Sequence, residues 1–184
     1  LGYWKNVVGR MGIKEYLDFR LGKDAKDKLY YFPDIYEESG RGMDYGCALV
    51  SIFEGKNLDV DAYDPLIEGY DTVYKPTGLK YFNSTNGIAM NAYDFIFCCN
   101  VIDHTPDPQV IIDDFIRLLK NGGRLYFEVH FDPQLGSPCH SMLWNEEVVK
   151  RYFTKEHFKL IREAVFNGSF EGQRSYQAVY EVNK

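Results

Sequence analysis

The sequence of 184 residues contains only four cysteines, no long apolar run and no excess of positive charge. No stretch reaches the roughly 18 apolar residues that a membrane-spanning helix needs. The net charge is −6, and the basic residues form no stripe of the kind that nucleic-acid binders carry. Cys98 and Cys99 are adjacent in an apolar run, which is typical of buried thiols in a reducing compartment. We therefore expect a cytoplasmic protein that contacts neither a membrane nor nucleic acid, while the oligomeric state stays open.

The chain also lacks the glycine pattern of a dinucleotide-binding protein. Such proteins use Gly-x-Gly-x-x-Gly to bring the backbone against a pyrophosphate. Of that set only Gly46 is present, in the run Gly42-Met-Asp-Tyr-Gly-Cys-Ala48. A nicotinamide-dependent oxidoreductase is therefore the weaker of the enzyme hypotheses.

The length predicts one domain with a small appendage, because domains average roughly 150 residues. Residues 1–40 mix aromatic and charged side chains, and we expect them to form a helical lead-in segment. Such a segment either buttresses the sheet or closes over a pocket as a lid. Residues 41–184 alternate between short extended runs and helical ones, which predicts an α/β domain with a mostly parallel sheet.

The expected elements follow from apolar periodicity and from helix caps. Strands are predicted over residues 43–46, 60–63, 93–99, 124–130, 159–166 and 175–182, the last two pairing as an antiparallel hairpin. A brief helix is predicted over 49–54. A longer one begins after Thr105 or Asp107 and stops at Asn121-Gly122-Gly123, and a third runs from Asn145 to Tyr152.

A turn and an acidic residue indicate a ligand site. The turn at Gly46 ends the first strand, where backbone N–H groups and a helix N-terminus could face a ligand. Asp64 follows Gly46 by 18 residues at the end of the next strand, close to the spacing of about 20 expected for an acid that binds ribose hydroxyls. Carboxyl ends of neighbouring parallel strands meet at one edge of a sheet, so these groups should lie together. Taken alone, the turn could also be an ordinary strand-to-helix connection.

Residues 94–130 carry a more specific pattern. Asp94 opens a buried strand, the turn Asn100-Val101-x-x-His104 precedes a helix, and Gly122-Gly123 precedes the next strand. This order and spacing resemble class I S-adenosylmethionine-dependent methyltransferases, of the small-molecule, type 11-like kind, over about residues 41–130. The resemblance implies a three-layer Rossmann-like sandwich whose sheet has seven strands, mostly parallel, with an antiparallel C-terminal hairpin.

The resemblance also implies S-adenosyl-L-methionine as the cofactor. The turn would cradle its methionine part, Asp64 would accept hydrogen bonds from the ribose, and Leu66 would cover the adenine ring. The implied cofactor-binding residues are Asp44, Gly46, Cys47, Ala48, Asp64, Leu66, Ser84, Thr85, Asn100 and Val101. The family turn reads Asp-x-Gly-x-Gly-x-Gly, whereas Ala48 and Val50 stand at its second and third glycines. A degenerate member that binds without turnover therefore remains the alternative.

Methyl transfer to a hydroxyl is helped by a general base, and His104, His130 and His140 are the candidates. Each could instead be a structural residue of a turn or strand end. Asp132, Cys139 and His140 show no zinc-ligand spacing, so we expect no metal. The small size and the acidic charge favour a small-molecule acceptor, whose identity the sequence does not disclose.

Overall fold

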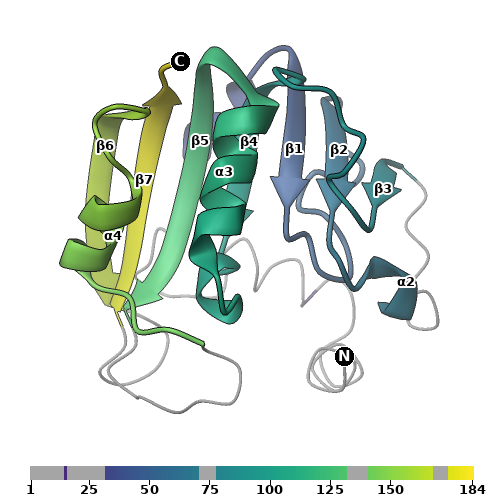
Figure 1. The fold of residues 1–184 in the computed structure, drawn as a ribbon. Coiled ribbons are helices and arrows are strands. Elements are labelled where there is room, and N and C mark those ends of the chain that lie inside the picture. Colours follow the sequence, from purple (N-terminus) through teal and green to yellow (C-terminus); the bar gives the residue numbers. More distant parts are fainter. Residues whose placement is uncertain (1–14, 16–31, 71–77, 132–140, 168–173) are drawn as a thin grey trace.

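The computed structural model describes residues 15, 32–70, 78–131, 141–167 and 174–184. Its strands form one sheet of seven in the order β3-β2-β1-β4-β5-β7-β6 (Figure 1). They are β1 (Arg41–Tyr45), β2 (Asp59–Tyr63), β3 (Lys80–Phe82), β4 (Tyr93–Cys99), β5 (Leu119–Phe131), β6 (Phe158–Asn167) and β7 (Arg174–Val182). The first five strands pair in parallel, and β7 is antiparallel to both β5 and β6. The predicted fold class, including the C-terminal hairpin, is confirmed.

Two of the described helices, α3 and α4, are capped where the sequence predicts. The described helices are α2 (Ile67–Tyr70), α3 (Pro108–Leu118) and α4 (Glu146–Tyr152), with 3-10 turns η1 (Pro33–Glu37) and η2 (Ile102–His104). Asp107 caps α3 by accepting a hydrogen bond from Gln109 N at 3.1 Å, so it fills the role left open between Thr105 and Asp107. Asn145 caps α4 through Val148 N at 2.9 Å.

Apolar clusters cover both faces of the sheet. One cluster contains side chains of α3 and α4, which lie on the same face (Figure 1), packed on residues such as Ile96 and Phe127. The other joins Phe32 and Ile35, beside and within η1, to Phe53 and to the opposite face of β4. The sheet is therefore sandwiched, and its carboxyl edge is left to form the site.

Three details differ from the sequence-based prediction. Residues 49–54 form turns instead of a brief helix, although Leu49, Val50 and Phe53 are buried as a helix face would be. Strand β3 was not predicted, because three residues give too little periodicity. The helix predicted to run up to Asn121 ends at Leu118, and β5 begins at Leu119. The proposed lead-in segment, residues 1–40, lies mostly outside the described residues.

Candidate functional site

A cleft of about 560 Å³ opens at the carboxyl ends of β1, β2 and β4. Its walls come from the turn after β1, the end of β2, the loop after β3, the segment after β4 and one side of α3. The lining residues include eight of the ten predicted cofactor-binding residues, namely Gly46, Ala48, Asp64, Leu66, Ser84, Thr85, Asn100 and Val101. Parallel strands that end at one edge thus bring these residues together, as the spacing between Gly46 and Asp64 suggested.

The turn after β1 shapes the floor of the cleft. Gly46 has a φ of +80°, and a Cβ there would meet both methyl groups of Val101. The N–H groups of Gly46 and Cys47 both donate to Tyr63 O, at 2.7 and 2.9 Å. The expectation that the N–H groups of this turn face a ligand is therefore corrected at these two residues. No helix follows the turn within residues 46–58, so no helix N-terminus contributes either.

Asp64 joins this turn to the end of β2. Its Oδ2 accepts a hydrogen bond from Ala48 N at 2.9 Å, and its Oδ1 accepts one from Leu66 N at 2.8 Å. A carboxylate offers about four lone-pair sites, so these two hydrogen bonds do not by themselves exhaust its capacity as an acceptor. Asp64 is 8% exposed and lines the cleft, which is the arrangement that a ribose-binding acid requires.

Asp44 and Cys47 are the two predicted cofactor residues outside the cleft lining, as far as the described residues define it. Both are fully buried. Asp44 Oδ2 accepts hydrogen bonds from Ser51 Oγ at 2.6 Å and Ile52 N at 3.2 Å. Asp44 therefore stabilises the turn indirectly, by accepting hydrogen bonds from the segment that follows it.

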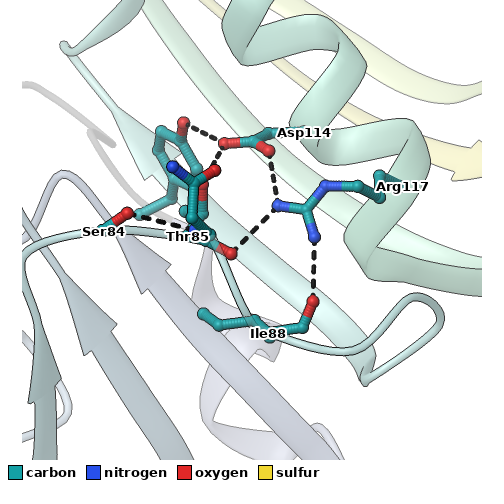
Figure 2. Close-up of polar contacts among 7 residues, drawn as sticks. Ser84, Thr85, Ile88, Asp114 and Arg117 are labelled. Carbon is teal, nitrogen blue, oxygen red and sulfur yellow. Dashed lines mark hydrogen bonds and ion pairs between the residues drawn. The ribbon is translucent and has the colours of Figure 1, made fainter.

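A polar cluster around Asp114 forms another part of the cleft wall, and the sequence analysis missed it (Figure 2). Asp114 on α3 accepts hydrogen bonds from Tyr45 Oη at 2.9 Å and Thr85 Oγ1 at 2.8 Å, both at Oδ2. Its Oδ1 accepts one from Arg117 Nη2 at 2.7 Å. Arg117 also donates to the backbone oxygens of Thr85 and Ile88, at 3.2 and 2.9 Å. The i, i+3 spacing of Asp114 and Arg117 signals a pair on one helix face, but nothing local to α3 indicates that this face meets Thr85.

Burial and neighbouring carboxylates keep the tyrosines of this wall protonated. Desolvation, followed by the charge of Asp114, raises the pKa of Tyr45 far above its ordinary value. Desolvation and the same carboxylate also raise the pKa of Tyr63, which contacts Tyr45 at a ring-centroid distance of 4.7 Å. Tyr45 is therefore a fixed hydroxyl donor to Asp114.

The histidines are placed differently from one another. His104, at the end of η2, is exposed and lines the cleft, with Nε2 4.0 Å from Asp103 Oδ1. His130 is not among the described lining residues; its Nε2 lies 3.6 Å from Oε1 of the buried Glu128. His140 falls outside the described residues, as do Asp132 and Cys139, so the catalytic role of His140 stays a prediction and the expected absence of a metal there is untested. Within the described ranges, no group of three or more potential ligands could hold a metal ion.

Asn100 places a buried polar atom in the cleft lining. It has a φ of +54° and lies in the cleft lining. Its Oδ1 is buried and has no hydrogen-bond partner among the described residues. Buried polar atoms are normally satisfied, so an unsatisfied one beside a cleft fits a site that a polar ligand completes.

A family model for the methyltransferase domain matches residues 16–171. The chain belongs to this family of S-adenosylmethionine-dependent methyltransferases. A ubiquinone biosynthesis O-methyltransferase of Vibrio atlanticus (strain LGP32) is 32% identical over 75 residues, which are 40% of this chain and 31% of that protein. This methyltransferase chain thus matches about a third of the length of that curated relative.

Two solved structures share the fold. The N-methyltransferase NodS of Bradyrhizobium japonicum WM9, in complex with S-adenosylhomocysteine, is 15% identical with a TM-score of 0.61, covering 92% of this chain and 98% of that chain. A Haemonchus contortus N-methyltransferase, in complex with phosphomonomethylethanolamine and S-adenosylhomocysteine, is 13% identical with a TM-score of 0.57, covering 79% and 49%. Family membership sets aside the nicotinamide-dependent oxidoreductase.

The residues of the cleft fit S-adenosylmethionine. The volume lies within the 300–1,000 Å³ typical of small-molecule sites. A carboxylate at the end of β2 suits ribose hydroxyls, and the buried Asn100 Oδ1 suits a polar or cationic group. Among the described helices, none is long and apolar enough to cross a membrane.

Proposed function

We propose that this methyltransferase binds S-adenosylmethionine in the cleft between β1, β2 and α3 and methylates a small-molecule acceptor. The observation that carries the proposal is the convergence of Gly46, Asp64, Thr85 and Asn100 on one cleft at the carboxyl edge. When bound, the cofactor supplies a methyl group already activated by its sulfonium. The protein's task is then mainly to position donor and acceptor.

Each wall has a proposed role in holding the cofactor. Asp64, fixed by the N–H groups of Ala48 and Leu66, accepts hydrogen bonds from ribose hydroxyls. The half-exposed Leu66 side chain covers the adenine ring. Asn100, Val101 and the turn at Gly46 bind the methionine part of the cofactor. The buried Asp44 and Cys47 stabilise that turn without contacting the cofactor.

His104 and His130 are the proposed bases for an acceptor hydroxyl. His104 stands at the mouth of the cleft, where it could take a proton from an acceptor beside the cofactor. Its backbone is pinned by Ser141, because Ser141 N donates to Asp103 O at 2.8 Å and Ser141 Oγ donates to His104 O at 3.3 Å. His130 has the Glu128 carboxylate 3.6 Å from its Nε2, which is beyond hydrogen-bond distance, and it lies outside the described cleft lining, so it is the weaker of the two candidates. Neither role is needed if the acceptor atom carries no proton to remove.

The small-molecule acceptor is supported by the relatives and by charge. The curated relative is an O-methyltransferase of ubiquinone biosynthesis, and one structural neighbour was solved with phosphomonomethylethanolamine. The net charge of −6 disfavours a polyanionic acceptor such as nucleic acid.

Calorimetric titration with S-adenosylmethionine, S-adenosylhomocysteine and NAD tests the cofactor. Binding of the first two without a response to NAD is expected. Asp64→Ala should weaken S-adenosylhomocysteine by about 1–3 kcal/mol, since charge-assisted hydrogen bonds are lost. Asp59→Ala, at the exposed start of the same strand, is the matched control and should leave affinity unchanged.

Turnover is tested with a labelled methyl donor and pools of small-molecule acceptors. A product that forms with wild type and decreases with His104→Ala, at unchanged cofactor affinity, supports the proposed role of His104. Cofactor binding without any product would instead favour the degenerate, non-catalytic alternative. If neither S-adenosylmethionine nor S-adenosylhomocysteine binds in the titration, the proposed site is contradicted.

A further inference from the structure

A second hollow, a groove of about 850 Å³, lies between α4 and the C-terminal hairpin. Figure 1 shows α4 in front of β6 and β7, at the opposite edge of the sheet from β3. As far as the described residues define them, the groove and the cleft share no lining residue. The volume of the groove lies within the range of small-molecule sites, so it has room for a ligand of its own.

The walls of the groove are largely apolar. Val149 and Phe153 of α4 form one wall, and the other contains three residues of β6, namely Phe158, Leu160 and Val165. Leu160 and Val165 are 45% and 42% exposed, and they are two of the six large apolar side chains that the described residues expose. Exposed apolar side chains that gather in a groove mark a binding site, whereas single ones scattered over a surface do not.

The floor of the groove contains two tyrosine hydroxyls whose protons are already used. Tyr176 Oη donates to Glu163 Oε2 at 2.7 Å, and it lies 2.8 Å from Tyr180 Oη. A phenol has one proton, so Tyr180 is the donor to Tyr176. Burial raises the pKa of both phenols, which keeps them protonated at neutral pH. An apolar chain can therefore lie beside them without leaving either donor unsatisfied.

Three lysines line the groove, although the whole chain carries a net charge of −6. Lys159 is paired with Glu181 at 3.1 Å. Lys150, in the last turn of α4, and Lys155, in the turn that follows, form no ion pair or hydrogen bond with any described residue. Two unpaired cations at one end of an apolar groove complement a ligand with an anionic head.

The two carboxylates of the groove lie toward its other end. At the lysine end, Phe158 pairs with Val182 of β7. Glu163 pairs with Ala178, four residues along β7 and about 13 Å away. Glu146 is the first residue of α4, whereas the two unpaired lysines lie in its last turn and beyond it. The groove thus has a cationic end, an apolar middle and an anionic end, and this polarity directs the head of an anionic ligand to the lysines.

We propose that this groove is a second ligand site of the methyltransferase, which binds an amphipathic anion with an alkyl chain and a carboxylate head, as in a fatty acid. The chain lies along Val149, Leu160 and Val165, and the head lies at Lys150 and Lys155. The chain covers apolar side chains that β6 exposes, and the head supplies the negative charge that these two lysines lack. The site does not depend on the cofactor proposed for the cleft.

Calorimetric titration with dodecanoate, below its micelle concentration, tests the site. One site is expected, with an affinity at least roughly 10-fold higher than for octanoate or for dodecyltrimethylammonium. Octanoate has fewer methylene groups to bury, each worth about fourfold in affinity, and the ammonium ion has the same chain with the opposite charge. Equal binding of the ammonium ion, or no binding of dodecanoate to wild type, overturns the proposal.

Matched variants at exposed positions locate the ligand. Lys150→Gln should weaken dodecanoate about 3- to 10-fold, whereas Arg151→Gln removes the same charge outside the groove lining and should stay within about twofold of wild type. Leu160→Asn should weaken dodecanoate by about 10-fold, because apolar contact is lost. Ile161→Asn, at the next residue and outside the groove lining, should leave the affinity unchanged. Melting curves verify that each variant is folded.

Equal losses of affinity in the two members of each pair overturn the proposal, because they indicate binding that is not located in the groove. Val110→Asn changes an exposed residue of the cleft and should leave dodecanoate binding unchanged. A loss of affinity in Val110→Asn would place the ligand in the cleft and also overturn the proposal. Binding of S-adenosylhomocysteine without binding of dodecanoate overturns this proposal alone and leaves the proposed function intact.

Discussion

The connection from β1 to β2 and the connection from β4 to β5 join parallel neighbours of one sheet, yet only the second contains an α-helix. Residues 46–58 form turns fastened to the buried carboxylate of Asp44. The second connection is built around α3, which has a capped start and buries Ile111, Ile112 and Phe115. Both supply walls of the cleft. The first connection combines the buried side chains of Ile52 and Phe53 with hydrogen bonds to one carboxylate, whereas the second is held by helix packing. Variants that separate these two modes of support test the comparison.

The largest effect is expected from Asp44→Ala in the first connection. The change removes a charged acceptor and leaves Ser51 Oγ and Ile52 N without it in a buried site. The free energy of unfolding should decrease by about 3 kcal/mol, because hydrogen bonds to charged groups are worth about 1.5–3 each and buried donors become unsatisfied. Denaturant unfolding measures the loss.

Asp107→Ala is the matched change in the second connection. It removes the N-cap of α3, where Asp107 Oδ1 accepts a hydrogen bond from Gln109 N at an exposed position. A loss of about 1 kcal/mol is expected, as for other N-caps. Equal losses of unfolding free energy in Asp44→Ala and Asp107→Ala would contradict the view that hydrogen bonds to a single carboxylate contribute more to the first connection than to the second.

Gly46→Ala should rank between Asp44→Ala and Asp107→Ala in size. The new methyl group would meet the Val101 side chain, and φ is +80°, so strain and contact add to about 2–3 kcal/mol. Gly55→Ala lies in the same connection with a φ of +72° but meets nothing within 4 Å. Its cost should therefore be the dihedral alone, about 1–2 kcal/mol. A Gly55 variant as unstable as the Gly46 variant would show that contact with Val101 is unimportant.

The same comparison explains which elements the sequence could predict. α3 has a cap, a proline in its first turn and apolar residues on one face, and these local signals agree. Residues 49–54 carry apolar side chains too, but Val50, Ile52 and Phe53 are mediocre helix formers in a segment too short to nucleate. The Asp44 carboxylate binds Ile52 N instead, a contact that periodicity cannot reveal.

The part of the cleft lining that follows strand ends could be predicted from the sequence. The part that depends on contacts between α3 and the loop after β3 could not. Gly46, Asp64 and Asn100 follow strand ends, and topology alone brings them to one edge. Asp114 joins the cleft lining, with Arg117 behind it, only through the packing of α3 against the loop after β3, and that loop follows the strand that was missed. The N–H groups of Gly46 and Cys47 donate to Tyr63 O at the end of the neighbouring strand β2, and the sequence pattern does not reveal this contact.

Ala48→Gly should stabilise the first connection. Ala48 stands at the family's second glycine and has a φ of +54°, a conformation that costs an L-residue about 1–2 kcal/mol. Glycine relieves that strain but is more flexible when unfolded, so a net gain of about 0.5–1 kcal/mol is expected. Ala62→Gly, in the buried middle of β2, should destabilise instead, since it removes packing without relieving strain. A loss of stability in Ala48→Gly would indicate that the methyl group packs well enough to outweigh its dihedral.

The smallest effect concerns Asp94 of β4, which contacts the first residue of β1 and the second residue of β5 at the amino edge of the sheet. Its carboxylate accepts hydrogen bonds from Lys120, just after α3, and from Arg41 N at the start of β1, each at 2.8 Å. Hydrogen bonding to Lys120, and then to the Arg41 backbone, lowers the pKa of Asp94 below its ordinary value of 3.8. The folded state then binds this proton less readily than the unfolded state, so the stabilisation is complete above about pH 4–5 and is lost as the pH falls below the ordinary value.

Asp94→Asn should therefore lower the free energy of unfolding at neutral pH by less than about 1 kcal/mol, because both charged partners are partly exposed. The difference from wild type should shrink as the pH decreases from about 6 to 2, since acid removes the same charge from wild type. Urea unfolding at several pH values measures this convergence, with Asp113→Asn as the exposed control. A difference that stays constant with pH would assign the role of Asp94 to shape, for instance to its packing against Gly40, and not to its charge.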